Sequence, residues 1–164
     1  MHRYWLALAV LLFWCRPAGA QTTLVMQLVH DPAGIALSGS GTAAASANFG
    51  TVAAFGGTVP SGVTKTAGAS SFTLNTTIDI NVSKGPLDIL DLLSSSYTLT
   101  AKLQAADAQN IWKWNSMTLS TTATTITSGG TYTSTTPYTF SLTVPFSATA
   151  GTISNTIQMT AVAN

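Results

Sequence analysis

The feature that most constrains the fold is a strict alternation of large apolar and short polar side chains near the C-terminus. From residue 138 to 146, every second position is apolar: Tyr138, Phe140, Leu142, Val144 and Phe146. Successive side chains of a β-strand point to opposite faces, so this pattern predicts a strand with one buried face. After a break at 147–151, the alternation resumes at Ile153 and continues to Ala163. We expect these two strands to pair with each other, antiparallel, at the centre of an all-β domain.

Other segments show the same alternation and are separated by turn-forming residues. Predicted strands with this pattern are Thr22–His30, Ser71–Val82, Tyr97–Ala105, Ile111–Trp114 and Met117–Leu119. Further predicted strands are Ile35–Ser38, Phe49–Phe55 and a hairpin of Thr124–Thr127 with Thr131–Thr133. Gly39–Ala47 has no clear pattern. One short helix is expected near 86–93, because Pro86 suits a first helical turn. Many short strands with almost no helix predict an antiparallel β-sandwich.

Residues 1–20 have the features of a cleaved signal peptide. A short basic start is followed by the apolar run Tyr4–Cys15 and then by the small residues Ala18-Gly19-Ala20. We expect cleavage after Ala20, which leaves residues 21–164 as a single sandwich domain. An uncleaved membrane anchor is the alternative, although the apolar run is shorter than the roughly 20 residues of a usual span.

The predicted mature chain carries very little charge. It keeps four lysines and five aspartates, giving a formal net charge of −1, and it has no arginine, glutamate or cysteine. Nucleic-acid and polybasic membrane binding both need clustered basic side chains, so we expect neither partner, nor any membrane span in the mature chain. The protein is predicted to be secreted, either to the periplasm or to the cell surface and beyond.

The stock of chemically active side chains argues against catalysis. The mature chain has one histidine, His30, which lies beside Asp31 in a predicted turn. Asp88 and Asp91 could form a calcium site only if a backbone carbonyl and Asp79 or Asn81 joined them, and we favour the alternative that they lie on the solvated face of a short helix. We therefore expect no enzyme activity, no cofactor and no metal.

Trp112 and Trp114 form the most distinctive pair in the sequence. At positions i and i+2 of a strand, both indoles point to the same face. On an exposed face they would form a stacking platform for sugar rings, which predicts a carbohydrate-binding module. The alternative is that both rings fill the core, and the cost of leaving tryptophan in water favours this second interpretation.

Several short motifs, taken together, resemble a known group of proteins. They are Asn48-Phe49-Gly50-Thr51-Val52, Tyr97–Ala101, Phe140–Phe146, Ala150-Gly151-Thr152 and Ile157–Ala161. With the leader, they look like the small secreted immunoglobulin-like sandwiches of bacterial envelopes, such as spore coat U-like and fimbrial-subunit-like proteins. The resemblance implies an immunoglobulin-like sandwich of about eight or nine strands and a surface or assembly role. Unlike fimbrial subunits, this chain has no cysteine pairs, and its final strand is present within the chain.

The N-terminal strand points to a mode of assembly. It carries Leu24, Met26 and Leu28 on one face and has none of the charges or prolines that prevent edge pairing. If this strand is free, we expect it to add to the sheet edge of another molecule. The predicted function is therefore a non-catalytic structural or surface-interaction protein whose partner is itself or another envelope protein. A glycan partner at Trp112 and Trp114 is the alternative.

Overall fold

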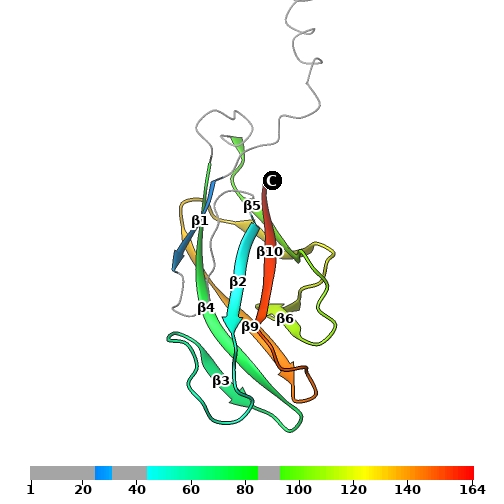
Figure 1. Cartoon of the computed structure of the whole chain (residues 1–164). Coiled ribbons are helices and arrows are strands. Elements are labelled where there is room, and N and C mark those ends of the chain that lie inside the picture. Colours follow the sequence, from blue (N-terminus) through cyan, green and yellow to red (C-terminus); the bar gives the residue numbers. More distant parts are fainter. Residues whose placement is uncertain (1–24, 31–43, 85–92) are drawn as a thin grey trace, which may run out of the picture.

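A computed structural model describes residues 25–30, 44–84 and 93–164 (Figure 1). It contains ten strands in two antiparallel sheets, which confirms the predicted all-β class. The predicted signal peptide, Leu24, Ile35–Ser38 and residues 86–92 of the predicted helix, with Asp88 and Asp91, lie outside the described residues.

The larger sheet has six strands and is built around two long central ones. Its members are β1 (Val25–His30), β3 (Thr64–Ala67), β4 (Ser71–Ser83), β6 (Ile111–Trp114), β7 (Met117–Thr118) and β9 (Thr135–Pro145). The order is β1-β4-β9-β6-β7, and β3 pairs with the part of β4 that β1 leaves open. β4 and β9 pair over their whole shared length without a register shift.

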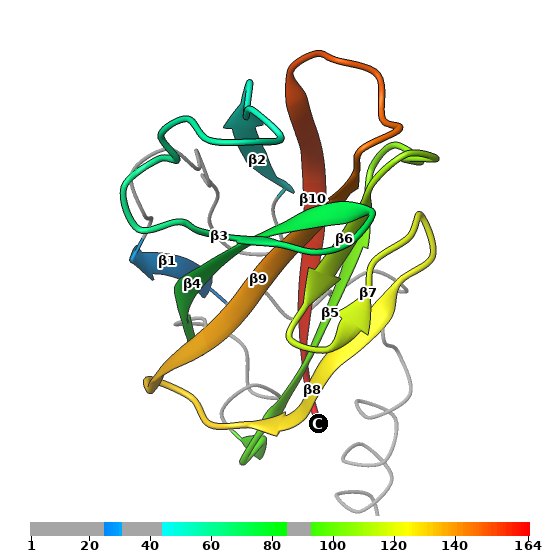
Figure 2. The same ribbon diagram turned by 90° about the horizontal axis from the view of Figure 1, so that it is seen from below.

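The smaller sheet has four strands in the order β2-β10-β5-β8. Their bounds are β2 (Ala44–Gly50), β5 (Tyr97–Leu103), β8 (Thr124–Gly130) and β10 (Ile153–Ala163). The two sheets lie face to face, and β9 crosses over β10 in the view of Figure 2. This arrangement is a β-sandwich, as the alternation of apolar and polar residues predicted.

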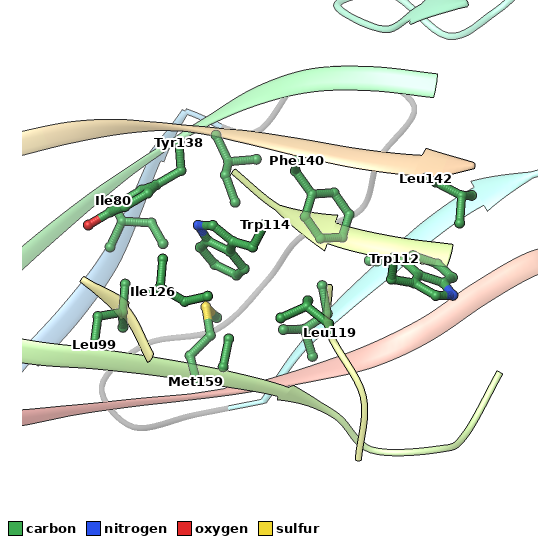
Figure 3. Close-up of a cluster of buried hydrophobic side chains, with 14 of the residues drawn as sticks. Ile80, Leu99, Trp112, Trp114, Leu119, Ile126, Tyr138, Phe140, Leu142 and Met159 are labelled. Carbon is green, nitrogen blue, oxygen red and sulfur yellow. The ribbon is translucent and has the colours of Figure 1, made fainter. Parts of the chain in front are cut away.

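The inner faces of both sheets form one core. From β4 come Phe72, Leu74, Ile78, Ile80 and Val82; from β9, Tyr138, Phe140, Leu142 and Val144; from β5 and β10, Tyr97, Leu99, Ile157 and Met159. These are the alternate positions of each strand, so a single residue pattern explains both the strand and its buried face. Figure 3 shows part of this core, with the rings of Trp114 and Phe140 between the layers.

The predicted pairing of the two C-terminal strands is wrong. β9 is central in the larger sheet, flanked by β4 and β6, whereas β10 is central in the smaller one, flanked by β2 and β5. Each strand has a buried face, and the chain between them passes from one sheet to the other, so those faces meet across the core. Alternation identifies a buried face, but it does not distinguish pairing within a sheet from packing between sheets.

Three shorter assignments also need correction. Residues 44–47 belong to β2, which ends at Gly50 and does not run on to Phe55. β3 was not foreseen. Ser128–Gly130 does not form the turn of a hairpin but lies in β8, where Gly130 pairs with Tyr97. A Cβ at Gly130 would lie 2.3 Å from Cζ of Tyr97, so glycine is needed there for a buried ring and not for a turn.

Candidate functional site

The predicted strand-addition segment lies in the sheet of its own chain. β1 pairs antiparallel with the last part of β4, with Met26 opposite Val82 and Leu28 opposite Ile80. The ladder is interrupted by a register shift between Leu28 and His30. The strand is therefore not free in a single molecule, but its second side faces no other strand of the described residues.

The same side of β4 is shared by two short strands. β3 pairs with Phe72–Asn75 and β1 with Asp79–Ser83. Between them, Thr76, Thr77 and Ile78 have no strand partner on this side among the described residues. The hydroxyl of Thr76 donates instead to the carbonyl of Gly62, at 2.9 Å. This margin of the sheet therefore consists of two short strands, β1 and β3, and not of one continuous strand.

Trp112 and Trp114 are buried, each with 1% of its surface exposed. Phe140 packs against both indoles, with ring centroids 6.0 Å from each, and Phe49 lies 5.9 Å from Trp112. Neither ring presents a face to a ligand, so the predicted stacking platform is not formed by this pair. The strand turns both indoles inward because the same face of neighbouring β9 carries Phe140 and Leu142.

Asp107 anchors the first of these two tryptophans. Its Oδ2 accepts a hydrogen bond from Nε1 of Trp112 at 2.7 Å and another from Nδ2 of Asn110 at 2.9 Å. Its Oδ1 accepts from the backbone N–H groups of Gln109 and Asn110. Partial burial alone would raise the pKa of this carboxyl, but the hydrogen bonds from Trp112, Asn110 and Gln109 outweigh it and hold the pKa below its ordinary value. Asp107 was not singled out in the sequence, although Asp-x-Gln-Asn is a recognisable turn pattern.

The second tryptophan lies in a different environment. Nε1 of Trp114 and the hydroxyl of Tyr97 are buried without a hydrogen-bond partner. Tyr138 packs edge-on against Trp114, with centroids 5.8 Å apart. Burial, reinforced by the neighbouring Tyr97, raises the pKa of the Tyr138 hydroxyl well above its ordinary value, so this phenol stays neutral.

A hollow of about 370 Å³ opens at the end of the sandwich where β2 and β9 finish. Its walls are the loop 51–54, the segment 109–110 and the connection 144–153, and Phe72 also lines it. None of the residues lining it is charged. Phe55 stands beside it, 74% exposed, with its ring 4.8 Å from that of Phe146.

The described part of the chain offers little other chemistry. It contains no group of three His, Cys, Asp or Glu side chains placed to hold a metal ion. No helix among those residues is long and apolar enough to cross a membrane. Candidate functions therefore rest on the sheet margins and on the hollow.

Comparisons with family models, with curated proteins and with solved structures found no match to this chain. The resemblance to envelope sandwiches consequently stays a prediction. The fold itself defines the class: an all-β protein of two packed antiparallel sheets.

Proposed function

We propose that the protein is a non-catalytic, exported structural protein that assembles with copies of itself by exchanging strand β1. In this proposal β1 leaves its own β4 and pairs with β4 of a second molecule, in the same register. The immunoglobulin-like character of the sandwich and its place at the bacterial surface, both implied by the resemblance, belong to the same proposal.

The observation that carries the proposal is the position of β1 at the sheet margin. Among the described strands, β4 is the only one with which its six residues form a ladder, and they include no Lys, Arg, Asp, Glu or Pro. Natural edge strands use charge or proline to prevent pairing with other molecules. Exchange of an identical element between copies preserves every native contact, so it needs no new interface to be stable.

The low charge of the chain supports the same function. Charged residues make up 7% of the sequence, where soluble domains average about 25%. A small net charge leaves little repulsion between copies. Threonine and serine cover the outer faces instead, as in the pair Thr73 and Thr143, whose hydroxyls lie 3.0 Å apart on neighbouring strands.

Light scattering coupled to size exclusion tests the proposal on the protein from Gln21 to Asn164. We expect ordered oligomers whose population grows with concentration. Deletion of residues 21–30 should leave a folded monomer, because β4 keeps its ladder with β9. A monomer at every concentration contradicts the proposal, and so do oligomers that survive the deletion.

A further inference from the structure

We propose that the hollow at the end of the sandwich, with Phe55 at its rim, binds a neutral sugar ring. This site lies apart from β1, so it does not depend on the proposed assembly. It moves the sugar-stacking role away from Trp112 and Trp114, which are buried, to an aromatic side chain that is exposed.

The turn that carries Phe55 is held in place by a lysine. Nζ of Lys65 donates to the carbonyl of Ala53 at 3.0 Å and to that of Gly56 at 2.5 Å, so its two acceptors flank Phe55 in the chain. Gly56 and Gly57 supply the positive φ angles, 61° and 72°, that the turn requires. The exposed ring is therefore presented on an ordered turn, which reduces the entropy that a ligand would otherwise have to remove.

The hollow behind this ring is also formed before any ligand arrives. Gln109 on one wall donates through Nε2 to Oγ1 of Thr149 on the other, at 3.2 Å. The backbone N–H of Thr149 donates back to Oε1 of Gln109, at 3.1 Å. This reciprocal pair links the two walls. The volume falls within the range of about 300–1,000 Å³ that is usual for small-molecule sites.

The lining selects the chemical class of the ligand. A charged group would lose its hydration in an uncharged hollow without gaining an ion-pair partner, so the ligand is neutral. The lining also includes polar side chains, those of Thr51, Gln109 and Thr152. The ligand should therefore bring hydrogen-bonding groups into the hollow.

A sugar ring meets both requirements. Its hydroxyl groups donate hydrogen bonds, and its C–H groups form an apolar face. These weakly positive C–H groups suit the negative face of an aromatic ring, which Phe55 offers at the rim. Phe146 and Phe72 continue the aromatic surface inward, with centroids 6.3 Å apart.

Amide chemical shifts measured by NMR during titration with neutral trisaccharides of glucose, mannose and N-acetylglucosamine test the assignment. We expect saturable shifts of the Phe55, Asn110 and Thr149 amides with at least one of them. Phe55→Ala should weaken that binding by about tenfold or more, which corresponds to about 1.4 kcal/mol. Lys65→Met should weaken it by a smaller factor, because it frees the turn but keeps the ring.

Leu93→Ala is the matched control, because Leu93 is an equally exposed apolar side chain, at 78%. It should leave the titration unchanged. Absence of saturable shifts at about 10 mM sugar, enough to fill a site with a dissociation constant of about 1 mM, overturns the proposal. So does sugar binding that Phe55→Ala leaves intact. If an uncharged Ser/Thr peptide shifts these amides while the sugars do not, the hollow is a peptide site and the sugar assignment is wrong.

Discussion

The six-stranded sheet has two margins that are built in opposite ways. At one, β6 and β7 extend the sheet beyond β9, and the two indoles of β6, those of Trp112 and Trp114, are buried in the core. At the other, β4 is covered by two short strands, and no strand of the described residues pairs with the three residues between them on this side. A register shift in β1 further interrupts this second margin.

The difference lies in what holds each margin to the sandwich. Besides its ladder with β9, the β6–β7 margin is held by the buried side chains of Trp112 and Trp114 and by the bond between Trp112 and the carboxylate of Asp107. The β1 margin adds a backbone ladder whose hydrogen bonds any copy of the same strand can supply. We therefore expect substitutions at the first margin to change stability and substitutions at the second to change assembly.

The largest effect on stability should come from Trp114→Ala. This substitution removes a fully buried indole from the middle of the core and leaves a cavity, for which we expect a loss of about 3–5 kcal/mol in the free energy of unfolding. Urea denaturation followed by circular dichroism measures it. Ile111→Ala in the same strand is the control, because Ile111 is 47% exposed and its truncation should change stability by only about 0.5 kcal/mol. Equal losses for both variants would mean that Trp114 does not anchor this margin.

The next effect should come from two prolines in β1, Met26→Pro with Gln27→Pro. Successive N–H groups of a strand point to opposite sides, so one of the two prolines must remove a bond of the ladder to β4. We expect oligomers to disappear, with a loss of about 2 kcal/mol in the stability of the remaining monomer.

The matching substitutions in β3, Thr66→Pro with Ala67→Pro, disturb the neighbouring strand on the same side of β4. These should leave oligomers in place, as seen by light scattering. Oligomers that resist the β1 prolines, or that are lost with the β3 prolines, would contradict the role of β1.

A smaller effect is expected for Asp107→Ala. The variant leaves Nε1 of Trp112 without its acceptor, and because Asp107 is partly exposed we expect a loss of only about 1 kcal/mol. Asp107→Asn keeps one acceptor oxygen, which can preserve either the bond from Trp112 or the bonds from the backbone, so it should lose less than Asp107→Ala. Urea midpoints of the two variants provide the comparison. If Asn proves as damaging as Ala, one acceptor oxygen is not enough to stabilise this margin.

The smallest effect concerns pH. The pKa of Asp107 is lower in the folded protein than its ordinary value of 3.8, so the folded state binds this proton less readily than the unfolded chain does. The stabilisation is therefore present above that ordinary value and is lost as pH falls through the folded pKa. We expect the urea midpoint of the native protein to drop as the pH is lowered below 3.8. Asp107→Asn should show a shallower drop. If its urea midpoint depends on pH as that of the native protein does, Asp107 does not cause the drop.

The sequence predicted the strands with long alternation and failed where the pattern is short. β4 and β9 follow the period of two over most of their length, so most of their inward residues were foreseen. The bounds of β4 were foreseen to within one residue, but β9 begins at Thr135, before the predicted start at Tyr138. β2 was missed because small residues such as Ala44 and Ser46 give no contrast between faces. β3 was missed because its four residues contain a lysine, Lys65, that serves a turn elsewhere in the chain.

The candidate sites were harder to predict than the strands. The alternation with Lys113 predicted only that Trp112 and Trp114 share a face. Their burial agrees with the core interpretation, which the cost of leaving tryptophan in water favoured. Phe55 gave no such signal, because its exposure depends on the turn formed by Gly56 and Gly57 and on Lys65, ten residues further along the chain. The hollow is lined by segments near residues 52, 110 and 148. A local residue pattern does not predict contacts between segments so far apart in the chain.

Cysteine cross-linking between chains tests the exchange of β1 most directly. The predicted mature protein has no cysteine, so any disulfide that forms must join the introduced cysteines. Gln27 lies opposite Asn81 in the ladder between β1 and β4, and directly opposed residues of antiparallel strands have Cα atoms about 4.5–5.5 Å apart, which suits a disulfide. Gln27→Cys and Asn81→Cys would be made as single variants, co-expressed in one cell and oxidised.

Thr77→Cys and Thr139→Cys form the control pair, because these residues oppose each other in the permanent ladder between β4 and β9. The account predicts disulfide-linked dimers that contain one Gln27→Cys chain and one Asn81→Cys chain, and no such dimers for the control pair. If the Gln27→Cys and Asn81→Cys chains do not cross-link, while a double variant closes the bond within a single chain, β1 stays on its own sheet and the proposed assembly is contradicted.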